Sequence, residues 1–172
     1  MQIGSGGVSL SSELYSSNGV IRGPDVMTDG NNVFMGTTFL LVLAAADWQI
    51  QLANPVGSNR KIFIDQVVIS EQSGHLTQIT LNSGIAATTV ANWRSCKDGG
   101  TAGLGLIKTQ GAAPVGGNAT HLLMMPNATP VVITPNFPWE ITAGGTFTIG
   151  DAVAPGANSL ITVCFLGREF AV

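Results

Sequence analysis

The chain has 172 residues, of which only 10% are charged and 45% are hydrophobic, with a formal net charge of −3. This apolar content excludes a disordered chain, and the few Lys and Arg residues form none of the clusters that binding to nucleic-acid phosphates requires. The longest apolar run, residues 39–46, is far shorter than the roughly 20 residues of a membrane-spanning helix. We therefore expect neither nucleic acid nor a membrane as a partner.

Residues 1–32 differ in composition from the rest of the chain. They contain six glycines and six serines and show almost no hydrophobic periodicity. This composition predicts an extended N-terminal arm. Such an arm either frays at the terminus or becomes ordered against a neighbouring subunit, and the sequence leaves both alternatives open.

Residues 33–172 are predicted to form a single domain of short strands without helices. About eight or nine strands are expected, because apolar and β-branched runs alternate with turns rich in glycine and proline. The candidate strands span residues 33–43, 48–52, 61–70, 76–81, 85–93, 120–125, 131–134, 139–141, 146–149 and 159–166. Residues 99–117 are predicted to be largely a Gly/Ala-rich loop with a short apolar piece at 104–107. This pattern indicates an all-β sandwich or barrel.

Two of these strands, 62–69 and 160–166, are mainly apolar on both alternating faces. A strand of an antiparallel sandwich normally shows one polar face to water, so the outer faces of these two strands should be covered. A neighbouring subunit, a loop or the N-terminal arm could cover them, and we favour a subunit. The candidate interface residues on the last strand are Leu160, Ile161, Val163, Phe165 and Leu166.

The scarcity of charged side chains also favours association with other subunits. The chain carries 7 Lys and Arg and 10 Asp and Glu residues, whereas a folded monomer of this mass exposes roughly 8,000 Å² of surface. A surface so sparsely charged is poorly protected against association. An obligate oligomer or lattice component is therefore expected, with a Thr/Asn-rich monomer as the alternative.

Residues that could carry catalysis are few and scattered. His75 and His121 are the only acid–base groups for neutral pH, and nothing in the spacing brings Cys96 close to either of them. We predict no enzymatic activity, no cofactor and no metal site. Asp25 and Asp29 resemble part of a calcium loop that lacks its distal glutamate, which leaves a loop calcium site open.

The tryptophans Trp48, Trp93 and Trp139 offer a second kind of candidate site. Exposed side by side, they could form a platform on which sugar rings stack. In an all-β domain, large aromatic side chains more often fill the core or an interface. We expect core or interface positions for all of them.

The last third of the chain carries a family resemblance. Residues 137–141 read Phe-Pro-Trp-Glu-Ile, residues 142–147 read Thr-Ala-Gly-Gly-Thr-Phe, and an Ala/Pro/Gly-rich loop at 152–158 precedes a closing apolar strand. That strand ends in Gly167-Arg168-Glu169-Phe170. Over residues 130–172 the chain resembles the final strands of small jelly-roll structural proteins of tailed bacteriophages, among them the head decoration or cement proteins.

This resemblance implies a jelly-roll-like antiparallel β-sandwich, preceded by the extended arm. It also implies a homotrimer on the outer capsid surface of a virion that clamps subunits of the major capsid protein together. The family has no catalytic motif to transfer. The slightly acidic arm suits an outer surface better than a genome-lining one.

Two other functions remain open on this fold. The first is a receptor- or carbohydrate-binding module of a phage tail fibre or tail tip. The second, weaker alternative is an enzyme such as a cupin-type metalloenzyme, which the wide separation of the two histidines in the sequence disfavours.

Overall fold

The computed structural model describes residues 33–172 except residues 87, 97–99 and 101. The predicted arm, 1–32, lies outside the described residues. Within them the chain forms strands and no helix, and every strand pair is antiparallel. The strands are β1 (Val33–Val42), β2 (Gln49–Ala53), β3 (Arg60–Glu71), β4 (Leu76–Leu81), β5 (Thr88–Ser95), β6 (Ala102–Gln110), β7 (Asn118–Met124), β8 (Val131–Ile133), β9 (Trp139–Ile141), β10 (Thr146–Asp151) and β11 (Ser159–Ala171).

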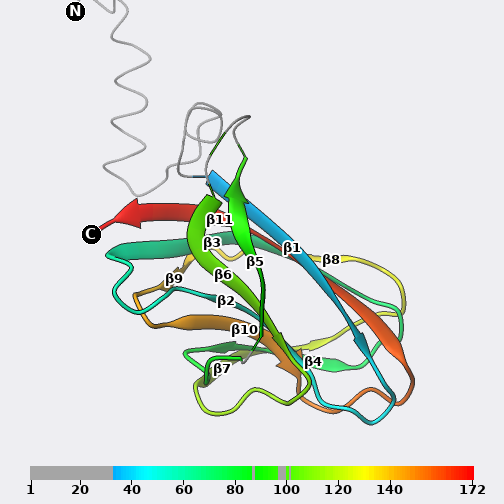
Figure 1. Cartoon of the computed structure of the whole chain (residues 1–172). Coiled ribbons are helices and arrows are strands. Elements are labelled where there is room, and N and C mark those ends of the chain that lie inside the picture. Colours follow the sequence, from blue (N-terminus) through cyan, green and yellow to red (C-terminus); the bar gives the residue numbers. More distant parts are fainter. Residues whose placement is uncertain (1–32, 87, 97–99, 101) are drawn as a thin grey trace, which may run out of the picture.

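All the strands belong to one curled sheet (Figure 1). Its order is β7-β4-β10-β2-β6-β5-β1-β11-β3-β8, with β9 paired to β3. Phe147 on β10 and Phe165 on β11 pack edge-to-face with ring centroids 6.1 Å apart, although β2, β6, β5 and β1 separate their strands in the sheet. The sheet therefore folds back on itself into two layers. This arrangement confirms the predicted all-β antiparallel sandwich and is consistent with a jelly-roll-like fold.

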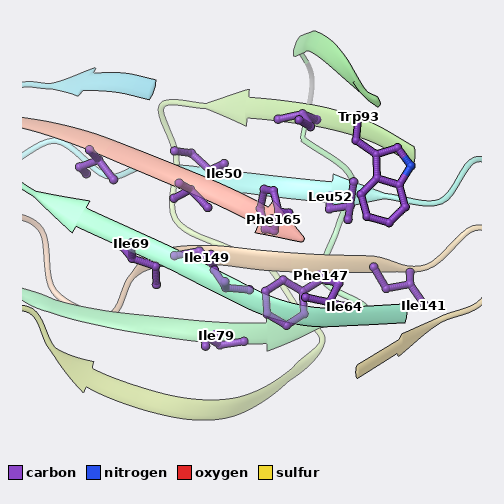
Figure 2. Close-up of a cluster of buried hydrophobic side chains, with 14 of the residues drawn as sticks. Ile50, Leu52, Ile64, Ile69, Ile79, Trp93, Ile141, Phe147, Ile149 and Phe165 are labelled. Atoms are coloured by element: carbon purple, nitrogen blue, oxygen red, sulfur yellow. The ribbon is translucent and has the colours of Figure 1, made fainter. Parts of the chain in front are cut away.

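The core lies between the two layers and contains aromatic and β-branched side chains (Figure 2). Burying such side chains is the main favourable term in folding. β3 and β11 contribute the longest row of side chains with no exposed surface: Ile62, Ile64, Val67, Ile69, Ile161, Val163 and Phe165.

A β-bulge explains why β3 reads as apolar on both faces. Its pairing with β11 shifts register at Leu166/Gly167, so that Ile64 and Val67 both point into the core although three positions separate them. An extra residue in one strand reverses the alternation beyond it. The outward side of β3 is consequently mixed rather than apolar, with Phe63, Asp65 and Gln66 half-buried there. The two-faced pattern seen in the sequence holds for β11 but not for β3.

Another prediction, the long loop at 99–117, is wrong. Residues 102–110 form the full strand β6, which pairs with β2 and β5. A Cβ on Gly103 or Gly105 would overlap the indole of Trp93, so glycine is what lets this strand pass beneath the ring. Glycine inside a strand often marks such a close approach, but in a sequence it has the appearance of a loop.

The outer side of β2 and β10 is covered by the chain itself. Gln51 Nε2 donates hydrogen bonds to Ser83 Oγ at 3.0 Å and to the Gly84 carbonyl at 2.6 Å, and Gln51 Oε1 accepts one from the Ala86 amide at 2.7 Å. Residues 82–86 thus lie over β2, and every residue of β2 and β10 is buried. These strands therefore offer no surface to a partner.

Candidate assembly surface

The side chains that point outward from β1 and β11 form an exposed apolar surface. We call it the β1–β11 face, and its members are Met35, Thr37, Phe39, Leu41, Leu160, Thr162, Cys164 and Leu166. They are aligned by the antiparallel register, in which Met35 lies opposite Leu166 and Leu41 opposite Leu160. Residues directly opposite each other project on the same side of a sheet.

The exposure of this face is high for residues of this kind. Phe39 is 69% exposed, Leu41 64% and Met35 50%, and Leu160 is 42% exposed on the neighbouring strand. Leu43, which follows β1, is also exposed. Together these side chains present on the order of 500 Å² of apolar surface, near the upper end of the roughly 300–600 Å² typical for the largest patch on a monomer.

Cys164 lies at the centre of the face. It pairs with Thr37 on one side and with Val68 of β3 on the other, and exposed Val132 of β8 lies beyond Val68. Its thiol is half-buried and forms no disulfide. The apolar surface therefore continues from β1 across β11 and β3 to β8.

Charge is confined to one end of this surface. Arg168 donates two hydrogen bonds of 2.8 Å to the carboxylate of Asp65, and its guanidinium lies 5.7 Å from the centroid of the Phe170 ring. This bidentate pair neutralises both charges. Arg94 lies opposite Met35 at the same end. In the rows that contain Phe39 and Leu41, the described strands carry no outward charge.

The structure separates the five residues predicted for the interface into two groups. Ile161, Val163 and Phe165 point into the core and have no exposed surface, so they cannot reach a partner while the domain is folded. Leu160 and Leu166 point outward and belong to the β1–β11 face. A subunit contact on this strand remains a prediction, and these two leucines are the residues able to make it.

Sequence reasoning missed the contribution of β1. Met35, Phe39 and Leu41 were recognised as part of a strand but not as interface candidates. The signal was present, since the opposite side of the same strand supplies Phe34 and Val42 to the core. Both faces of β1 are apolar, as in β11.

A buried polar cluster lies beneath the sheet near Glu71. Glu71 Oε1 accepts a hydrogen bond from Thr77 Oγ1 at 2.7 Å, and Glu71 Oε2 lies 2.8 Å from His75 Nδ1. Trp48 Nε1 donates a hydrogen bond to His75 Nε2 at 2.9 Å, so the ring proton of a neutral His75 resides on Nδ1. Burial raises the pKa of Glu71 above its usual range, against the opposing effects of the Thr77 hydrogen bond and of His75.

This cluster has the residue types of an acid–base site but not the access. Glu71 has no exposed surface, and both nitrogens of His75 already face protein atoms. The other histidine, His121, is exposed on β7 and packs edge-on against Trp139. The arrangement therefore stabilises the fold by satisfying buried polar groups.

Two further buried carboxylates are held by backbone amides. Asp151 Oδ1 accepts a hydrogen bond from the Trp48 amide at 2.9 Å. Burial raises the pKa of Asp151, and the neighbouring Asp47 raises it further. Glu169 Oε1 accepts a hydrogen bond from the Gly105 amide at 2.8 Å. Among the described residues, no group of three or more His, Cys, Asp or Glu side chains could hold a metal ion. Asp25 and Asp29 lie outside that part of the chain.

The tryptophans do not form a common platform. Trp48 and Trp93 are completely buried, and half-buried Trp139 packs against Phe147 at 4.9 Å between ring centroids. Their predicted core positions are confirmed for Trp48 and Trp93. Sugar stacking on these three side chains would require the core to open.

Two comparisons with known proteins found no relative of this chain. No family model matches the chain, and a search of curated proteins found no match. Within the described strands and loops there is no helix long and apolar enough to cross a membrane. The exposed β1–β11 face is thus the feature on which a function has to be argued.

Proposed function

We propose that the chain is a structural protein that works by assembly, burying its β1–β11 face against neighbouring subunits. The proposal rests on one observation: Phe39, Leu41 and Leu160 are exposed together on a regular, uncharged stretch of sheet. The largest contiguous apolar patch on a protein surface is often functional, and contact with another protein is a common function for it. Burying about 500 Å² of it is worth about 12 kcal/mol before the costs of ordering and association are subtracted.

The specific role we propose is decoration of a phage head. In this role the chain binds copies of itself and the major capsid protein on the outer capsid surface, and so reinforces the shell. The resemblance of residues 130–172 supports it, and so does a sandwich fold with a large exposed apolar face. Contacts repeated across a lattice add avidity, so each one can be modest.

The tail-fibre alternative finds less support in the geometry. A carbohydrate-binding module needs accessible aromatic rings, and of the three tryptophans Trp48 and Trp93 are completely buried while Trp139 is half-buried against Phe147. Phe39, which β1 exposes, lies next to Leu41 and opposite Thr162, and the described strands carry no outward charged side chain in these rows to bind sugar hydroxyls.

A charge placed in the face should abolish assembly without unfolding the domain. We expect the wild type to sediment above its monomer mass of 17.7 kDa at micromolar concentration. It should also co-sediment with capsid shells of the encoding phage that lack this protein. Leu41→Asp should weaken both associations at least tenfold, because an isolated carboxylate is costly to bury. Sedimentation velocity and shell binding provide the measurements.

Val56→Asp is the matched control, because Val56 is 83% exposed in a turn outside the face. It should assemble like the wild type, and the thermal melts of both variants should match that of the wild type. Normal association of Leu41→Asp would refute the proposal, as would a wild type that is monomeric and does not bind shells. A mass near three times the monomer would favour the trimer that the resemblance implies.

A further inference from the structure

We infer that β1 carries the contact between copies through its free edge, by pairing antiparallel with β1 of a second copy about a two-fold axis. The inference rests on the proposed function, since it specifies how copies of the chain meet. It concerns the backbone at the edge of β1 as well as the side chains of the β1–β11 face.

β1 is paired along its whole length on one side only. Its ladder with β11 runs from Val33 to Val42. Its ladder with β5 consists of Phe34 opposite Ser95 and Met35 opposite Arg94, after which the two strands diverge (Figure 1). From Thr37 to Val42, β1 is thus an edge strand.

The direction of the backbone groups at this edge follows from one hydrogen bond. The Cys96 amide donates to the Val33 carbonyl at 2.9 Å, so the backbone of Val33 faces away from β11. Backbone groups in an antiparallel strand alternate sides with a period of two. The N–H and C=O groups of Thr37, Phe39 and Leu41 therefore point to the free edge, where no described strand pairs with them.

The other sheet edges carry features that discourage pairing. β8 is three residues long and flanked by Pro130 and Pro135, and β9 is equally short and follows Pro138. Shifts of register interrupt the pairing of β7 with β4 and of β5 with β6. Short strands, prolines and bulges are the usual means of blunting an edge.

β1 has none of these protective features. Its ladder with β11 is regular, and its sequence, Val-Phe-Met-Gly-Thr-Thr-Phe-Leu-Leu-Val, contains neither proline nor charge. An edge strand of this length and hydrophobicity strongly favours pairing with another strand. The contrast with the other edges makes β1 the preferred place for a new strand to add.

A second copy of β1 fits this edge better than a charged partner. An uncharged strand is self-complementary, because two copies bring no like charges together. Pairing centred on Phe39 would form about six hydrogen bonds between Thr37, Phe39 and Leu41 of the two copies. It would also join the two β1–β11 faces into one sheet surface, with Phe39 opposite Phe39 and Leu41 opposite Thr37 of the partner.

Pairing at this edge joins the two faces side by side, so it buries the edge backbone of β1 and the adjoining flanks of its side chains. The outward surfaces of both faces, on the order of 500 Å² of apolar side chain each, stay available to a further partner such as the capsid shell. Pairing about a two-fold axis predicts assemblies that contain an even number of copies of the chain. The trimer implied by the family resemblance would require a head-to-tail contact instead.

Removing one edge amide tests the pairing. In Thr37→Pro the lost N–H is one that faces the free edge, so the ladder with β11 stays intact and proline is tolerated there. In Thr37→Val the amide remains and the side chain has nearly the same shape. By sedimentation velocity, Thr37→Pro should dimerise at least tenfold more weakly than the wild type, and Thr37→Val should dimerise like it.

Amide hydrogen exchange of the wild type provides a second measurement that does not depend on a variant. The amides of Thr37, Phe39 and Leu41 should exchange at least tenfold more slowly at concentrations where the dimer forms than in dilute monomer. The amides of Thr38 and Leu40, which face β11, should be protected at both concentrations.

The outcomes separate this inference from the proposed function. If the wild type assembles but Thr37→Pro assembles equally well and the edge amides exchange at monomer rates, the edge pairing is wrong and the assembly role stands. A trimer also overturns the two-fold pairing, as does edge protection that is independent of concentration and disappears when residues 1–32 are deleted. A chain that stays monomeric but binds shells overturns the pairing alone.

Discussion

Replacing Trp93 with alanine should lower the free energy of unfolding by about 4 kcal/mol or more. The side chain has no exposed surface and stacks on Phe34 with ring centroids 5.3 Å apart. Truncating a buried tryptophan costs about 3–5 kcal/mol through lost burial and the cavity left behind. Here a further cost arises, because Trp93 Nε1 donates a hydrogen bond of 2.5 Å to the buried carboxylate of Glu169.

Trp93→Phe separates these two contributions. It keeps most of the ring but removes the indole donor, and Glu169 Oε1 retains the hydrogen bond from the Gly105 amide. The expected loss is about 2 kcal/mol, since a hydrogen bond to a charged group contributes roughly 1.5–3 kcal/mol. Urea denaturation followed by far-ultraviolet circular dichroism gives both values. A loss below about 1 kcal/mol for Trp93→Ala would contradict the placement of this ring in the core.

The second large effect is expected at Gly167, beside the β-bulge. A Cβ there would overlap the Phe63 carbonyl oxygen of β3 and come within 3.2 Å of the Ile64 Cα. These are backbone atoms of the paired strand, so they cannot rotate away as a flexible side chain would. Gly167→Ala should therefore cost about 3 kcal/mol, at the upper end of the usual range for overpacking.

Gly156→Ala is the matched control, because a Cβ at Gly156 would have no atom within 4 Å. The control should change the free energy of unfolding by less than about 0.5 kcal/mol in the same urea titration. Equal stability of the two variants would show that β11 does not approach β3 at Gly167 as closely as described.

Most of the fold could be predicted from hydrophobic patterning. The strand at 76–81 was predicted with its observed bounds, the one at 33–43 differs by one residue at its C-terminal end, and the one at 61–70 differs by one residue at each end. Patterning succeeds in these strands because alternate apolar side chains, such as Ile62, Ile64 and Ile79, point into the core. The alternation of Thr146-Phe147-Thr148-Ile149 likewise corresponds to a real strand, β10.

The errors arise where backbone geometry depends on distant residues. β6 was read as a loop because its glycines could be explained only by the ring of Trp93 lying above them. β3 was read as apolar on both sides because the bulge opposite Leu166 and Gly167 is specified by the pairing with β11. The polar side of β2 is buried by residues 82–86, for which the sequence predicts a turn at 82–84 followed by the start of a strand, with no sign that they lie over β2.

The candidate surface could be only half predicted for a similar reason. The sequence identified the last strand as apolar on both faces, which led to Leu160 and Leu166. It could not show that β1 lies next to that strand, and therefore that Phe39 and Leu41 extend the same surface. Nor could it show that β1 loses its second neighbour after Met35.

Chemical modification of Cys164 tests the central claim most directly. The thiol lies in the middle of the β1–β11 face, and Cys96→Ser leaves it as the only thiol in the chain. We expect N-ethylmaleimide to modify Cys164 at least tenfold more slowly in protein bound to capsid shells than in dilute monomer. Equal rates in the shell-bound and dilute protein would mean that this face stays open to water, which would contradict the account.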